Sequence, residues 1–267
     1  MELVPLGRAL RNYRNKVLHR FKRIELTPAD SALRYYRDLG PDAADPLLWI
    51  AREIKPGERV LDIGCGPGVL AEVTRRDKFC AFDGVDRDRA ALDRARTFYD
   101  ELAEADLEKD DLAAIAPRRD YDTIVLADVL EHLVWPGRLL RQVPSLLKSG
   151  GRVLISLPNI GYFGLVSELI AGRFAYRSCG LLDHSHLRHF TRASVGSFLA
   201  ANGFSARRID AIRKPIAATE FDPQLFEALP ETVRAALSSA VDADVFQFLI
   251  EAVADHTELV ASTDALI

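Results

Sequence analysis

The 267-residue chain is poor in cysteine and has no long apolar run. Cys65, Cys80 and Cys179 stand far apart, so they form neither a disulfide framework nor the paired spacing of a metal site, and a reducing compartment such as the cytoplasm is expected. No stretch approaches the roughly 18 consecutive apolar residues of a membrane span. With 48% hydrophobic and 28% charged residues, the composition excludes disordered and fibrous classes and admits one large domain or two small ones.

The net charge of −4 is unevenly distributed along the chain. Residues 1–23 hold seven lysines and arginines against the single acid Glu2, a balance of +6, so residues 24–267 carry −10. An acidic body does not attract a phosphate backbone, and a nucleic-acid partner is therefore not expected.

Apolar residues in this basic segment recur at spacings of three and four, from Leu6 and Leu10 to Val17 and Phe21. The pattern predicts a basic amphipathic helical extension over residues 1–40. Three interpretations stay open for it: self-association or docking on its own fold, peripheral contact with an anionic membrane, and a targeting presequence.

From about residue 46 onward, short β-type runs alternate with helical patterns. This order is typical of a doubly wound α/β fold, and it predicts a seven-stranded, mostly parallel sheet within one domain over residues 41–267. The expected strands are Arg59–Ile63, Ala81–Asp86, a short one ending near Asp106, Tyr121–Ala127, Arg152–Leu157, Phe204–Ile212 and Val245–Val253. The expected helices include Pro46–Ile54, Pro67–Arg76, Asp88–Tyr99, Pro136–Lys148 and Arg192–Ala201.

A glycine-rich turn follows the first strand, with Gly64, Gly66 and Gly68 at alternate positions. Glycines allow a sharp turn and let a ligand lie against the backbone. The third glycine falls one residue earlier than in the dinucleotide fingerprint, which argues against a nicotinamide cofactor. Asp86 ends the next strand, where a carboxylate can accept hydrogen bonds from both hydroxyls of a ribose.

The run from Asp62 to Gly68 resembles motif I of the class I S-adenosylmethionine-dependent methyltransferases, and Asp128-Val129-Leu130-Glu131-His132-Leu133 resembles the pattern its members carry after strand four. The resemblance implies a Rossmann-like fold, S-adenosylmethionine as cofactor and methyl transfer. The cofactor-binding residues it implies are Asp62, Gly64, Cys65, Gly66, Gly68, Asp86, Arg87, Asp106, Leu107, Asp128 and Val129.

A nearer resemblance appears at residues 181–191, which look like a segment of bacterial small-molecule and sugar-associated methyltransferases, including a branch related to the methionine-biosynthesis protein W. It implies O-methylation of a small-molecule acceptor, with a sugar or glycan among the candidates. Histidine is the usual base near pH 7. His186 matches the histidine of that segment and is the first candidate for catalysis, followed by His132 and His189; His132 fits a purely structural role equally well.

No metal is expected. On a strand, His184 and His186 would share one face and His189 the other, so a three-ligand site would need an irregular backbone. Residues 160–190 and 213–243 are expected to cover the substrate, with their aromatic residues Tyr162, Phe163, Phe174 and Tyr176 either stacking on the acceptor or forming a core. The competing hypothesis is a non-catalytic protein of the same fold that associates with another enzyme or a membrane.

Overall fold

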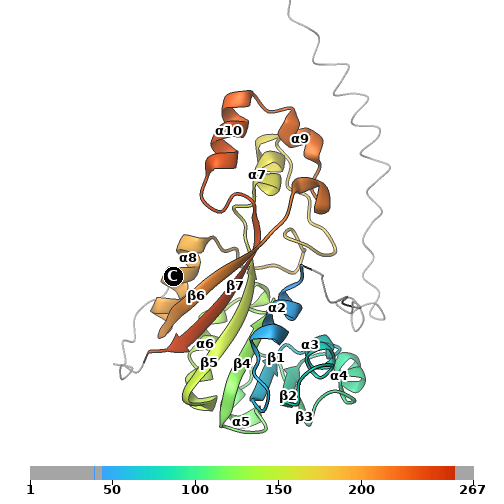
Figure 1. Cartoon of the computed structure of the whole chain (residues 1–267), viewed down its shortest axis with the longest axis vertical. Coiled ribbons are helices and arrows are strands. Elements are labelled where there is room, and N and C mark those ends of the chain that lie inside the picture. The colour runs from blue at the N-terminus through green and yellow to red at the C-terminus, as the bar shows by residue number, and fades with distance from the viewer. Residues whose placement is uncertain (1–38, 40–43, 256–267) are drawn as a thin grey trace, which may run out of the picture. The chain divides into compact units, whose positions relative to one another are not determined.

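The computed structural model describes Leu39 and residues 44–255 (Figure 1). Residues 1–38, 40–43 and 256–267 lie outside the described residues, and with them nearly all of the predicted helical extension. In the part of the chain that is described, no helix is both long enough and apolar enough to cross a membrane.

A seven-stranded sheet in the order β3-β2-β1-β4-β5-β7-β6 forms the centre of the fold, as the sequence predicts. The first five strands are parallel, whereas β7 runs antiparallel to both of its neighbours. The strands are β1 (Arg59–Ile63), β2 (Ala81–Asp86), β3 (Glu101–Glu104), β4 (Tyr121–Ala127), β5 (Leu147–Pro158), β6 (Phe204–Arg213) and β7 (Val245–Ala254). The strand order reverses between β1 and β4, and ligands of open α/β sheets bind beyond the carboxyl ends of the strands at such a point.

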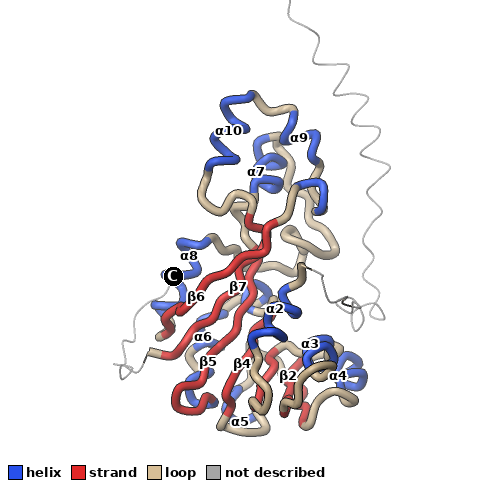
Figure 2. Tube along the Cα trace, viewed as in Figure 1, coloured by secondary structure: helices blue, strands red, loops and turns tan. Residues whose placement is uncertain are grey.

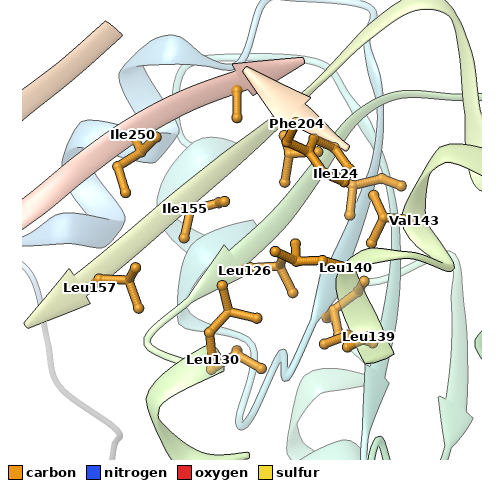
Figure 3. Close-up of a cluster of buried hydrophobic side chains, with 14 of the residues drawn as sticks. Ile124, Leu126, Leu130, Leu139, Leu140, Val143, Ile155, Leu157, Phe204 and Ile250 are labelled. Atoms are coloured by element: carbon orange, nitrogen blue, oxygen red, sulfur yellow. The ribbon is translucent and has the colours of Figure 1, made fainter. Parts of the chain in front are cut away.

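Helices cover both faces of the sheet. Neighbouring residues of a strand point to opposite faces, so each strand contributes to two hydrophobic cores. Val60 packs in one core with α2 (Pro46–Glu53), α3 (Val69–Thr74) and α4 (Arg89–Ala95), and Leu61 packs in the other. Figure 3 shows this second core, in which Ile124, Leu126 and Ile155 of the strands meet Leu139 and Leu140 of the helical layer. That layer consists of α5 (Leu112–Ile115), α6 (Pro136–Leu140), the 3₁₀ turn η3 (Val143–Leu146) and α8 (Arg192–Ala201).

Several element boundaries differ from those expected. Pro67 does not begin a helix: Gly68, with φ +89°, is the N-cap residue and α3 starts at Val69. The helix predicted over Pro136–Lys148 is broken into α6 and η3, which carries a proline in its first turn, and β5 already begins at Leu147. The helix predicted from Asp88 ends at Ala95 rather than Tyr99, and β3 ends at Glu104, two residues before Asp106.

The two expected insertions come together as a small helical lobe beyond the end of β5. It contains α7 (Phe163–Ile170), η4 (Ile216–Ala218), α9 (Pro223–Glu227) and α10 (Glu231–Ser239), and these helices gather at the top of Figures 1 and 2. Tyr162 is fully buried in the lobe's own hydrophobic core, and its hydroxyl donates to the carbonyl oxygen of Lys214 at 2.8 Å. Phe174 and Tyr176, by contrast, are exposed and pack edge to face.

Candidate active site

The glycine turn after β1 is held in the conformation that its sequence requires. Gly64, Gly66 and Gly68 have φ values of +74°, +51° and +89°, in the left-handed region that favours glycine. A Cβ atom on Gly64 would stand 2.7 Å from Cγ2 of Val129, whereas one on Gly66 would meet nothing within 4 Å. Gly64 is therefore needed for packing, and Gly66 faces open space in which a ligand can approach the backbone.

Asp86 at the end of β2 fixes this turn. Its Oδ2 accepts a hydrogen bond from the backbone N–H of Gly66 at 2.8 Å, and its Oδ1 accepts one from the N–H of Asp88 at 2.8 Å. Each carboxylate oxygen can accept a further hydrogen bond, so the two hydroxyls of a ribose still have acceptors. Arg87, which follows Asp86, is exposed.

Asp62 lies beneath the turn, fully enclosed. Burial, reinforced by the charge of Asp86, raises the pKa of Asp62 to about 7, although the Tyr99 hydroxyl donates a hydrogen bond to it at 2.5 Å. Burial also raises the pKa of the neighbouring Cys65 thiol well above its usual value. Asp62 thus changes its charge near neutral pH, directly under the glycine turn.

Asp106 and Leu107 lie just past the end of β3. The carboxylate of Asp106 accepts hydrogen bonds from Nζ of Lys109 at 2.6 Å and from the N–H of Glu108 at 3.0 Å, and these bonds lower its pKa. Leu107 lines a small, mainly apolar recess whose other lining residues are Ala105, Asp110, Leu112, Ile115 and Leu139.

The turn after β4 begins with a strained residue. Asp128 has φ +54°, an uncommon value for a residue with a side chain. Ser156 of β5 holds it from both sides: its Oγ accepts from the N–H of Asp128 at 3.0 Å and donates to Oδ1 at 2.7 Å. Gln247 donates to the same oxygen. The next residue, Val129, packs against Gly64.

A cluster of titratable groups follows in the 3₁₀ turn η2 (Leu130–His132). Glu131 is 1% exposed, and burial together with the charges of Asp128 and Asp183 raises its pKa well above the usual value. The His132 ring lies edge to face on that of His186, with the ring centroids 4.8 Å apart. Burial and the neighbouring His132 lower the pKa of His186.

The structure thus brings together His132 and His186, two of the three histidines that the sequence suggests for catalysis. His186 lies in the loop before α8, and the backbone of His184 to His189 is irregular rather than a strand. His189 is exposed. The sequence alone does not single out Glu131 or Asp183. The one signal for Glu131 is that an acidic residue stands between the apolar Leu130 and Leu133.

Comparison with known proteins agrees with this fold. A family model described as a methyltransferase domain matches residues 34–208. A ubiquinone biosynthesis O-methyltransferase of Aeromonas salmonicida is 28% identical over 160 residues, which cover 58% of this chain and 66% of that protein. The chain therefore spans about two thirds of the length of this curated relative.

Two solved structures share the fold at low sequence identity. An S-adenosylmethionine-dependent methyltransferase from Mesorhizobium loti superposes with a TM-score of 0.52 at 22% identity, covering 79% of this chain and 98% of that one. A second, from Archaeoglobus fulgidus, gives 0.54 at 20% identity and covers 77% and 90%.

The chain belongs to the methyltransferase domain family. The residues present fit S-adenosylmethionine, the cofactor that the sequence resemblance implies, since Gly66 leaves the inner side of the turn open and Asp86 offers two acceptor oxygens beside it.

Proposed function

We propose that the chain transfers the methyl group of S-adenosylmethionine to a hydroxyl of a small molecule. The observation that carries this proposal is the packing of Val129 against Gly64, which places the turn for the cofactor next to the cluster of Glu131, His132 and His186. A hydroxyl must lose its proton to be methylated, and carboxylates and imidazoles are groups that can assist this.

The names of the relatives support an oxygen acceptor. The curated relatives matched by the chain include O-methyltransferases of ubiquinone biosynthesis, and we extend O-methylation from them to this chain. A sugar or glycan acceptor and kinship with the protein W branch rest on residues 181–191 alone.

His186 is the residue that we assign to the proton of the acceptor. Its Nδ1 lies 3.2 Å from the carbonyl oxygen of Leu181. Because a carbonyl oxygen only accepts, the neutral ring carries its proton on Nδ1 and has a lone pair on Nε2. The lowered pKa of His186 keeps this ring neutral at pH 7.

The helical lobe is the proposed cover of the acceptor. Asn159 ties its first residues to the start of β7 and the turn that leads into it, because its side-chain amide donates to the carbonyl oxygens of Asp242 and Val245. Tyr162 belongs to the lobe's core and Phe163 packs against that core. The exposed Phe174 and Tyr176 are therefore the aromatic candidates for stacking on the acceptor.

Two further proposals concern the whole chain. We place the protein in the cytoplasm because its three cysteines are unpaired. The basic segment 1–23, for which we propose self-association or peripheral membrane contact, lies outside the described residues.

The test supplies the chain with S-adenosylmethionine labelled in its methyl group and measures label in a panel of aromatic diols and sugars. Each acceptor is paired with its analogue lacking the hydroxyl. We expect transfer to a hydroxylated member and none to its matched analogue. Cofactor binding without transfer to any acceptor would favour the non-catalytic hypothesis.

A further inference from the structure

Glu131 is buried at the carboxyl end of β4 without a partner for its charge. Neither of its carboxylate oxygens has a hydrogen-bond partner among the described residues. The charges that act on it come from Asp128 and Asp183 and are also negative. Burying a carboxylate is costly unless it takes up a proton or a cation or donor compensates its charge, so a positively charged ligand would stabilise the ionised form of Glu131.

Two imidazoles complete a set of metal ligands around this carboxylate. Glu131, His132 and His186 each offer one ligand atom, and the three atoms lie within 4.8 Å of one another. Nδ1 of His132 is 3.3 Å from the carbonyl oxygen of Ser185 and 3.1 Å from Oγ of Ser185, a hydroxyl that donates its own proton to Oδ1 of Asp183. Nδ1 of His186 likewise faces the carbonyl oxygen of Leu181. Both neutral rings therefore carry their lone pair on Nε2, the arrangement in which a second hydrogen bond orients a metal-binding histidine.

We propose that Glu131, His132 and His186 bind a divalent transition-metal ion. Two imidazoles and one carboxylate suit Zn²⁺, Fe²⁺ or Co²⁺, whereas Mg²⁺ and Ca²⁺ prefer oxygen ligands alone. Asp128 and Asp183 add negative charge around the ion. Three protein ligands leave coordination positions open, and oxygen atoms of an acceptor can occupy them.

This inference rests on the proposed function and changes one assignment in it. A divalent cation lowers the pKa of a hydroxyl that binds it, so the acceptor's proton passes to water and His186 acts as a ligand rather than as the base. Acceptors with two neighbouring hydroxyls are favoured, because two oxygens can fill two open positions of the ion.

The test titrates the full chain, first freed of metal with a chelator and dialysed, with CoCl₂ under visible spectroscopy and with ZnCl₂ under calorimetry. We expect one ion to bind per chain, with the visible absorption of Co²⁺ held by nitrogen ligands. Glu131→Gln and His186→Ala should each weaken binding on the order of 100-fold or more. His189→Ala removes an exposed histidine outside the set and should leave the affinity for Co²⁺ unchanged.

The same variants also serve as controls for effects on folding. Since Glu131→Gln removes a buried charge, the metal-free variant should melt at or above the temperature of the metal-free wild type, which separates lost ligation from lost folding. Failure of the folded wild type to bind Co²⁺ and Zn²⁺, or equal binding by Glu131→Gln, would overturn the site. Methyl transfer that survives metal removal would overturn the role of the ion and keep the proposed function. Metal binding without methyl transfer to any acceptor would keep the metal site and count against the proposed function.

Discussion

Val129 packs directly against Gly64, so that a Cβ atom added to Gly64 would stand only 2.7 Å from Cγ2 of Val129. This contact joins the turns after β1 and β4, which are neighbours in the sheet although 65 residues separate the two positions in sequence. The cofactor turn and the titratable cluster are therefore built as one unit, and substitutions on either side can test it.

Gly64→Ala should destabilise the fold through both strain and overlap. The added methyl group meets Val129 at a residue whose φ is +74°, and overpacking of this kind costs about 1–3 kcal/mol. Gly57→Ala is the matched control, since Gly57 has φ +83° and nothing within 4 Å of its Cβ position. Urea unfolding should show the larger loss for Gly64→Ala; equal losses would mean that the contact with Val129 is unimportant.

Asp86→Asn should weaken binding of S-adenosylmethionine. The substitution replaces one acceptor oxygen by an amide donor, which disturbs the bond to the N–H of Gly66 and the expected bonds to ribose. Losing a hydrogen bond to a charged group corresponds to about 10- to 100-fold in affinity. Calorimetric titration measures this effect, and an unchanged dissociation constant would exclude Asp86 from the cofactor site.

Asp62 should make the fold less stable as the pH rises. Its pKa is about 7 in the folded chain, against 3.8 for an unperturbed aspartate, so between these values the folded state holds more protons than the unfolded state, and stability falls as pH increases. From pH 5 to pH 8 the loss amounts to about 3 kcal/mol.

Asp62→Asn removes this titration and keeps an oxygen that can accept from Tyr99. The free energy of unfolding, measured at pH 5 and pH 8 in both proteins, should fall less steeply in the variant. Identical pH dependence in the two proteins would show that Asp62 does not titrate in this range.

The three thiols should differ in reactivity. Cys179 is exposed, whereas Cys65 and Cys80 are buried and burial raises the pKa of both. Because the thiolate is the reactive form, a disulfide reagent should modify one thiol per folded chain and three after denaturation. Rapid reaction of a second thiol in the folded chain would be inconsistent with the packing of Cys65 under the glycine turn.

The central strand Tyr121–Ala127 can be predicted because it is largely buried and reads as a short apolar run. Tyr121–Ala127 and Ala81–Asp86 begin and end where the sequence indicates. Helix boundaries are predicted less accurately: the left-handed backbone of Gly68 delays α3 beyond Pro67, a tertiary requirement of the turn that propensity does not reveal.

The titratable cluster could not be predicted, since it depends on contacts distant in sequence. His132 and His186 are 54 positions apart, and the loop that carries His186 has no periodicity that indicates its path. Its position is fixed by backbone hydrogen bonds, in which the N–H groups of Leu187 and Arg188 donate to the carbonyl oxygen of Glu131. The glycine turn and Asp86, by contrast, are local motifs that the sequence alone identifies.

The most direct test of a cofactor site at this turn is titration of S-adenosylmethionine into three proteins: the wild type, Gly66→Ala and Gly57→Ala. A Cβ atom on Gly66 meets no protein atom within 4 Å, so Gly66→Ala should fold about as well as Gly57→Ala while its methyl group enters the space assigned to the cofactor. We expect binding to the wild type and to Gly57→Ala, and none to Gly66→Ala. Equal binding to all three proteins, or no binding to the wild type, would contradict the account.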